Sequence, residues 1–202
     1  MAKARSKTDQ QNAIDMLLED HKKVQKMFKD FEKLERDDTE ALQELVTTAC
    51  TELKVHSMLE KELFYPAVRD QVDKEEDEDL LNEAEVEHQT VDQLIETLEG
   101  MDPGDAMYMA HFTVVSEYVK HHVQEEEKEM FPRVKKMKSL DLDALGEEMK
   151  ARKQELMTEF GGEGDEDAEL QELDEDEETS DSAEDEETEA EKGSGKQSRS
   201  RR

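Results

Sequence analysis

The chain has 202 residues, of which 42% are charged and 33% are hydrophobic, and its formal net charge is −31. No apolar run approaches the roughly 20 residues of a membrane span, and a surface this acidic repels nucleic acid and anionic membranes. The single cysteine, Cys50, excludes an internal disulfide. Because the first residues also lack the apolar core of a signal peptide, we expect a cytoplasmic protein with neither nucleic acid nor membrane as a partner.

Hydrophobic periodicity predicts a series of helices over residues 1–160. Apolar residues recur at steps of three and four, the helical period, in four stripes over 14–34, 42–67, 81–98 and 112–130. The second stripe runs through Leu53, His56, Glu60, Leu63 and Ala67. The breaks between stripes fall at "RDDTE", "VDKEEDED" and "GMDPGD", and a shorter fifth stripe covers 140–156.

Four long helices with short connections predict an all-α fold, an antiparallel up-down four-helix bundle. The short extra C-terminal helix is expected on the outside or at the end of this bundle. Between Glu163 and Glu191 there are 18 acidic residues and no Lys or Arg. Such a segment cannot bury enough apolar surface to offset its chain entropy. We therefore expect a bundle domain over 1–160 and a disordered acidic tail over 161–202.

The helical region contains an internal repeat. The segment "EDHKKVQKMF" around His21 aligns with "VEHQTVDQLI" around His88 at an offset of 67 residues. The segment "HSMLEKELFYP", residues 56–66, aligns with "HVQEEEKEMFP", residues 122–132, at an offset of 66. Two copies of one helical hairpin, packed about a pseudo-two-fold axis, would bring the matched residues together near that axis.

Polar residues interrupt the apolar stripes at matched positions in the two copies. They are His21, His56, Glu60, His88, His122 and Glu126. An unpaired polar group inside a bundle costs about 1–3 kcal/mol, and an unpaired carboxylate costs more. A His four residues before a Glu lies on the same helix face. Two such pairs and two further imidazoles in one layer form a cage suited to iron, manganese or zinc, and two bridging carboxylates would hold a two-metal centre.

Each ligand has an alternative interpretation. A single His in an apolar stripe is more often a hydrogen-bonded core residue, but four in matched register indicate a metal site. In the second copy, "HHVQEEEKE" permits three pairings, His121 with Glu125 and His122 with Glu126 or Glu127. The ten-residue distance from His to Pro, the same in both copies, selects His122 and Glu126. His111 has no matched histidine and is interpreted as a flanking or surface residue, and Cys50 as a small buried residue.

The order His, His-x-x-x-Glu, His, His-x-x-x-Glu, with "LFYP" and "MFP" after the acids, resembles the hemerythrin-like (HHE cation-binding) family over about residues 10–160. The resemblance implies two non-heme irons, bridged by carboxylates, that bind O2 or a related small ligand such as NO or peroxide. It also implies the metal ligands His21, His56, Glu60, His88, His122 and Glu126. Ferritin-like proteins use the reverse order, Glu-x-x-His, which occurs here only at Glu85 and His88.

Three functions follow from these patterns. The first is a non-enzymatic di-iron protein for oxygen or iron sensing, handling or stress response. Oxygen carriers of the family have a fifth histidine where this chain has Asp92, which argues against a pure carrier. The second is a di-iron enzyme acting on peroxide or NO at the same site. The third is a scaffold whose acidic tail binds a basic protein partner, with a solubilising role for the tail as its alternative. The patterns predict no oligomeric state.

Overall fold

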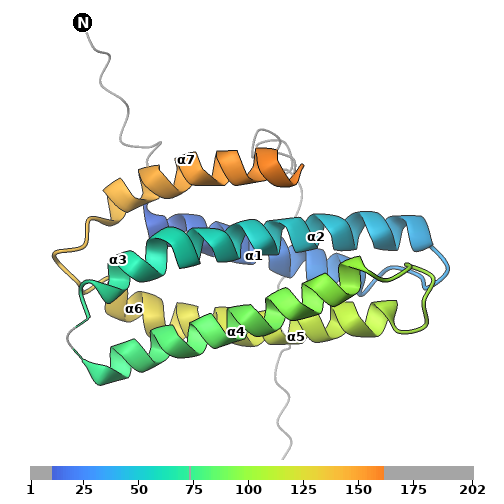
Figure 1. Ribbon diagram of the computed structural model, residues 1–202, viewed down its shortest axis with the longest axis horizontal. Coiled ribbons are helices and arrows are strands. Elements are labelled where there is room, and N and C mark those ends of the chain that lie inside the picture. Colours follow the sequence, from blue (N-terminus) through green and yellow to red (C-terminus); the bar gives the residue numbers. More distant parts are fainter. Residues whose placement is uncertain (1–10, 73, 162–202) are drawn as a thin grey trace, which may run out of the picture. The chain divides into compact units, whose positions relative to one another are not determined.

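The computed structural model describes residues 11–72 and 74–161, and every regular element in this part is a helix. The long helices are α1 (Ala13–Phe31), α2 (Thr39–Leu59), α4 (Glu75–Glu99), α5 (Tyr108–Glu125) and α7 (Leu142–Phe160). In Figure 1, α1 lies beside α2, α4 lies beside α5, and α7 lies along α1 and α2 on the outside, where the fifth helix was expected. The predicted all-α class is confirmed for these residues. The predicted tail, 161–202, lies outside the described residues apart from Gly161.

Helix ends are set by local side chains. Asn12, Asp38 and Asp141 begin α1, α2 and α7, and each side chain accepts a hydrogen bond from the backbone N–H three residues later. Such an N-cap satisfies a donor that the helix leaves unpaired and contributes about 1 kcal/mol. Helix α7 ends where Gly161 takes a left-handed conformation, with φ of 69°, which a residue without a Cβ adopts without strain.

Two π-turns continue the helices that carry the predicted His-x-x-x-Glu pairs. They are η1 (Glu60–Phe64) after α2 and η2 (Glu126–Met130) after α5, followed by the short helices α3 (Tyr65–Arg69) and α6 (Phe131–Val134). The next backbone N–H reaches back five residues, to the carbonyl of Glu60 or of Glu126. Each π-turn ends two residues before one proline of the repeat, Pro66 or Pro132. A proline has no N–H and crowds the carbonyl four residues earlier. The wider turn relieves that conflict.

The extra residue of the π-turn changes which side chains are buried. The predicted stripe continued through Leu63 and Ala67, but these two are only half-buried, and Phe64, Tyr65 and Val68 are buried instead. That part of the prediction was wrong by one residue. The reason is geometric, because a wider turn rotates every later side chain relative to a regular helix.

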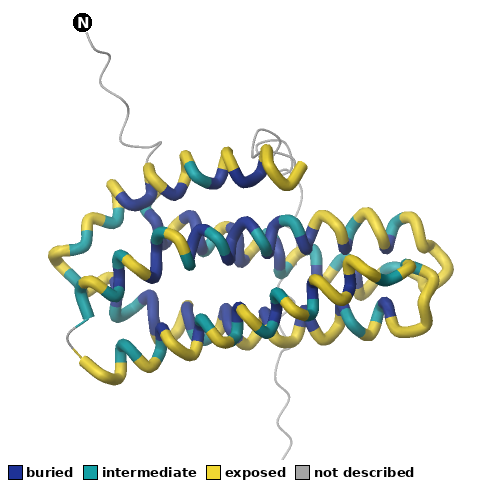
Figure 2. The backbone as a smooth tube through the Cα atoms, in the orientation of Figure 1, coloured by how far each residue is buried: buried dark blue, intermediate teal, exposed yellow. Residues whose placement is uncertain are grey.

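A polar layer divides the core into two apolar clusters. One cluster lies around Phe64 and Phe131 and includes residues of α7, and the other lies around Phe28 and Phe112. Figure 2 shows the buried residues on the sides of the helices that face one another. In α1 the change from one cluster to the other falls between Leu17 and Val24, on either side of His21. The predicted histidines and glutamates occupy this boundary.

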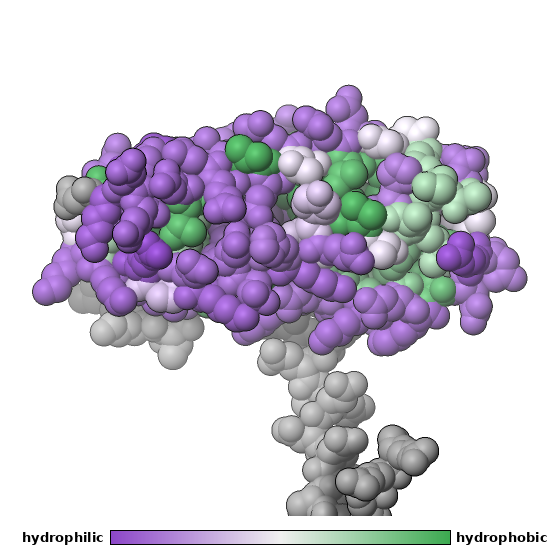
Figure 3. All heavy atoms as spheres, turned by 90° about the horizontal axis from the view of Figure 1, so that it is seen from below, coloured by the Kyte–Doolittle hydropathy of each residue, from purple (hydrophilic) through white to green (hydrophobic). Residues whose placement is uncertain are grey.

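The surface is mainly hydrophilic. Figure 3 shows one face covered largely by hydrophilic residues, with smaller hydrophobic areas between them. Within residues 11–72 and 74–161, no helix has both the length and the apolar character that crossing a bilayer would require.

Substituting Gly146 tests how closely α7 approaches the start of α1. A Cβ at Gly146 would lie 2.6 Å from the carbonyl oxygen of Gln11 and 2.9 Å from the nitrogen of Ala13. We expect Gly146→Ala to lower the free energy of unfolding by about 1–3 kcal/mol through overpacking, although Gly→Ala normally stabilises a helix by about 1 kcal/mol. Urea denaturation followed by circular dichroism measures this change.

Gly100→Ala is the matched control for this substitution. Its added Cβ would meet no atom closer than the Thr97 carbonyl oxygen at 3.5 Å, so the stability should be unchanged or slightly raised. A Gly146→Ala variant as stable as the unmodified chain would contradict the close approach.

Candidate metal centre

The six predicted side chains meet in one layer between the helices. They come from α1, α2, η1, α4, α5 and η2, in the order His21, His56, Glu60, His88, His122 and Glu126. None is more than 6% exposed. The layer lies where the two copies of the repeat face each other, so the pseudo-symmetry inferred from the sequence brings equivalent residues together.

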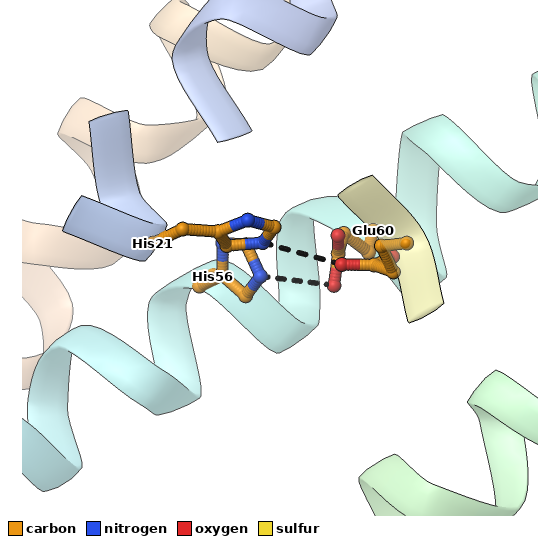
Figure 4. A group of neighbouring side chains, drawn as sticks. His21, His56 and Glu60 are labelled. Carbon is orange, nitrogen blue, oxygen red and sulfur yellow. Dashed lines mark ion pairs between the residues drawn. The ribbon is translucent and has the colours of Figure 1, made fainter. Parts of the chain in front are cut away.

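The first half of the centre is formed by the histidines of α1 and α2. The Nε2 atom of His21 lies 3.2 Å from a carboxylate oxygen of Glu126, and that of His56 lies 3.2 Å from Glu60. Figure 4 shows the imidazole rings of His21 and His56 close to each other, with the carboxylate of Glu60 next to them. Their ring centroids are 5.0 Å apart.

The second half repeats this arrangement with the histidines of α4 and α5. The Nε2 atom of His88 lies 3.0 Å from the same oxygen of Glu60, and that of His122 lies 3.5 Å from Glu126. Glu60 therefore faces one histidine of each half, and so does Glu126. A carboxylate placed in this way can bridge two cations, one in each half.

The donor atoms in this layer fit a bound cation. Several have no hydrogen-bond partner among the described residues although they are fully buried. They are Nε2 of His21, His56 and His122, Oε1 of Glu60 and Oε2 of Glu126. Most of them face one another at 3.2–3.5 Å without the geometry of a hydrogen bond, and a fully unpaired buried polar group costs about 1–3 kcal/mol. Imidazole nitrogen and carboxylate oxygen together suit iron, manganese or zinc, and a cation among them would remove this cost.

The outward ring nitrogens have acceptors of their own. The Nδ1 atoms of His21, His56, His88 and His122 face, in that order, Glu127 at 3.0 Å, Asp20 at 3.5 Å, Ser57 at 2.9 Å and Glu87 at 2.8 Å. All four imidazoles thus turn Nε2 to the centre and Nδ1 outward. Three of the outward nitrogens are at hydrogen-bond distance and geometry, whereas Nδ1 of His56 faces Asp20 without the geometry of a hydrogen bond. Metal-binding histidines are oriented in this way, since the outer acceptor sets the tautomer and raises the basicity of the ligating nitrogen.

Tyr65 is a further polar group of the centre that the stripes did not identify. Its phenol donates to Glu126 at 2.9 Å and lies 2.9 Å from Nε2 of His88. Burial and the negative charges of Glu126 and Glu60 raise the pKa of Tyr65 well above its ordinary value, so the phenol keeps its proton. The sequence did contain a signal for Tyr65, because the repeat aligns it with Phe131. In the structure Phe131 stacks on His21, so both aligned positions contact the centre.

When the layer holds no cation, protons bound to the histidines supply the positive charge beside the glutamates. Burial alone would lower the pKa of His122, but the charge of Glu126 and the hydrogen bond to Glu87 raise it to about 9. Burial is likewise outweighed at His56, whose pKa lies well above 6.5 because of Glu60 and Asp20. The pKa of Glu60 is held well below its usual value, against the effect of burial, by His56 and His88.

Lys153 of α7 reaches the outer part of the centre. Its Nζ atom lies 2.7 Å from Oδ1 of Asp20, and both side chains are buried. Burial raises the pKa of Asp20, but the hydrogen bond to His56 and the charge of Lys153 lower it below 3.8 overall. The sequence contained a signal for the burial of Lys153, because it lies four residues after Met149 and three before Leu156 in the fifth apolar stripe. Both of these residues are buried.

Two histidines with alternative interpretations lie away from this layer. The side chain of His121 is 60% exposed and contacts Glu125 at 3.5 Å and Glu87 at 3.7 Å. The structure therefore brings His122, not His121, into the buried cluster. His111 is half-buried, and its Nδ1 lies 3.0 Å from the carbonyl oxygen of Met107, one turn earlier on α5.

Asp92 and Cys50 also lie outside the cluster. Asp92, at the position where oxygen carriers would have a further histidine, forms an ion pair with Lys61 at 2.6 Å. Cys50 is buried and free, and burial raises the pKa of its thiol to about 12. The prediction that Cys50 is a small buried residue is confirmed.

A small cavity lies against the histidines. Its volume is about 30 Å³. Apart from the polar residues of the centre, its walls are the apolar side chains of Val24, Leu53, Val91, Val119 and Val123. This space admits a molecule the size of water or a diatomic gas.

Cation binding should release protons from this centre. The folded pKa of His122 is raised from 6.5 to about 9, so its proton stabilises the metal-free fold below pH 6.5, and this contribution is lost as the pH rises through about 9. A cation must displace that proton. We therefore expect the affinity for zinc(II) to increase from pH 6.5 to 9, with proton release at neutral pH.

Isothermal titration calorimetry in two buffers with different ionisation enthalpies measures the number of protons released. The exposed neighbour provides the control, since His121→Ala should release as many protons as the unmodified chain. An affinity that does not depend on pH would contradict the protonation of the buried histidines.

Comparisons with known proteins agree with the helical fold and with a domain that binds metal cations. Residues 12–134 match the family model described as the hemerythrin HHE cation binding domain. A solved hemerythrin HHE cation binding domain-containing protein from Mycobacterium kansasii is similar in fold, with a TM-score of 0.63 and 24% identity, over 74% of this chain and 89% of that one.

A curated relative, named as a DNA nickase of Nostoc sp., is 24% identical over 153 residues, which are 75% of this chain and 42% of the relative. The chain thus spans less than half the length of that protein. The family model, in contrast, covers more than half of the chain and includes all six residues of the layer. The chain belongs to the hemerythrin HHE cation-binding domain family.

Proposed function

We propose that this protein holds a non-heme di-iron centre that binds O2, NO or peroxide in oxygen or iron sensing, handling or stress response in the cytoplasm. The observation that carries the proposal is the position of Glu60 and Glu126. Each lies between one histidine of each half, at 3.0–3.5 Å. This is the arrangement of a carboxylate-bridged pair of cations, at the middle of an antiparallel four-helix bundle formed by α1, α2, α4 and α5.

The residues divide naturally between two metal positions. His21 and His56 would hold one cation, His88 and His122 the other, and the two glutamates would bridge them. When bound, two irons supply a redox-active centre that coordinates a small ligand. The chain itself orients the imidazoles through their outer acceptors and excludes bulk water by burying the layer.

The cavity beside the histidines supports a small ligand. At about 30 Å³ it has room for a diatomic molecule or peroxide and not for an organic substrate. The ion pair between Asp92 and Lys61 favours sensing or handling over reversible carriage, because no imidazole stands at the position that oxygen carriers of the family use.

One observation favours an enzyme as the second candidate. Tyr65 keeps its proton beside both Glu126 and His88, so a proton donor stands within the centre. Reduction of peroxide or NO consumes protons, and a positioned donor contributes about 10²–10⁴-fold to such a reaction.

Two other roles have less support. A basic protein partner for the acidic tail remains a proposal about residues outside the described part, and removing 163–202 should leave metal binding intact if tail and centre are independent. The DNA activity in the name of the Nostoc relative fits poorly with a net charge of −31, because DNA repels an acidic surface.

The adjacent histidines of α5 provide a matched test of the metal assignment. We expect the full chain purified in air to contain two irons, His122→Ala to lose about one, and His121→Ala to keep both, since only His122 faces the layer. Metal analysis with an optical spectrum measures this, and circular dichroism checks that each variant is folded. An unmodified chain that takes up no iron, or equal iron in both variants, would refute the assignment.

Tyr65→Phe separates binding from catalysis. If the protein is a binder, the iron-loaded chain should bind O2 or NO stoichiometrically without turnover, in the variant as in the unmodified chain. Catalytic turnover of peroxide or NO that falls by about 10²-fold or more in Tyr65→Phe would instead establish the enzyme. Stopped-flow absorption distinguishes the two outcomes.

A further inference from the structure

Helix α7 brings a buried lysine to the metal centre from outside the matched family domain. The family model ends at residue 134, and α7 begins at Leu142. The helix packs against the core through Met149 and Leu156, which are fully buried, and Gly146 lies against the backbone at the start of α1. Lys153 is therefore held in place by the docking of the whole helix.

Lys153 is connected to a proposed ligand through one carboxylate. Asp20 lies with Oδ1 at 2.7 Å from Nζ of Lys153 and with Oδ2 at 3.5 Å from Nδ1 of His56. A carboxylate behind a ligating histidine makes the imidazole a stronger donor. An ammonium group on the same carboxylate offsets that charge, and the effect is strong where water is excluded.

The repeat supplies an internal comparison. Asp20 corresponds to Glu87 at the offset of 67 residues, and Glu87 stands behind His122 in the same way, at 2.8 Å. The ion-pair partners of Glu87 are the two histidines of α5, whereas Asp20 is shared between a histidine and a lysine. The carboxylate at this position is thus paired with a lysine in one half only.

The other two outer acceptors differ in charge between the halves. His21 has Glu127 behind it, whereas the equivalent His88 has the neutral Ser57. Without Lys153, the first half would have two outer carboxylates and the second half one. With Lys153, the outer charge of the two halves becomes equal.

We propose that Lys153 is a positioning residue of the metal centre that acts through Asp20 and lowers the cation affinity of the position formed by His21 and His56, leaving the other position unchanged. This inference rests on the proposed two-metal function. In addition to packing against the bundle, α7 would then lower the cation affinity of one metal position relative to the other.

Titration of the metal-free full chain with cobalt(II), followed by its visible absorption, tests the proposal. We expect Lys153→Met to bind one of two cobalt ions about tenfold more tightly, the size of effect typical of outer-shell changes, with the other affinity unchanged. Lys153→Arg keeps the charge and should match the unmodified chain. Lys150→Met, an exposed lysine of the same helix, should match it as well.

Other outcomes would overturn the inference. If Lys153 only docks α7, Lys153→Met should lower the melting temperature and leave both affinities unchanged or weaken both together. If Lys153→Met fails to fold, Lys153→Gln, which can still donate to Asp20 without a charge, must show the same tightening. An unmodified chain that binds two cobalt ions while Lys153→Met leaves their affinities unchanged refutes this inference alone. A chain that binds no cobalt refutes the proposed function with it.

Discussion

The burial of two carboxylates at the centre of an apolar core is the constraint on which the rest of the structure depends. Glu60 and Glu126 are at most 1% exposed, and a buried charge is tolerated only when positive charge and hydrogen bonds surround it. Four imidazoles, from α1, α2, α4 and α5, and the phenol of Tyr65, from α3, supply those contacts. A shift of one helix along another would break these contacts, so the layer favours the observed alignment of the helices.

The two π-turns show how the backbone serves this layer. Each begins at a site glutamate and ends two residues before a proline. The crowding of the backbone by that proline thus widens the helix where the carboxylate enters the core. The same turn carries Tyr65 into contact with the centre and leaves Leu63 half-buried. Pro66 and Pro132 thus act on the site without touching it, by changing the rotation of the chain around it.

The two halves have the same inner side chains and differ in the residues that lie behind them. Tyr65 is matched by Phe131 and Ser57 by an apolar residue of α5, and only the first half receives a lysine from α7. Because the two helical hairpins are similar, they place equivalent donor atoms at the centre. Helix α7 packs mainly against α1, α2 and η1, all of the first hairpin, and breaks this symmetry. Differences between the two positions must therefore arise in the outer contacts.

The sequence by itself determined the helical class and the six inner residues, because a polar residue in an apolar stripe is conspicuous and the repeat shows it twice. It also selected His122 over His121 through the distance to the proline. Only the tertiary structure decided the register after Glu60, the contact of Tyr65 with the centre and the contact of Lys153 with Asp20. These depend on a π-turn, which the regular helical period cannot represent, and on a contact between residues 133 positions apart, which is created only when α7 packs against α1 and α2.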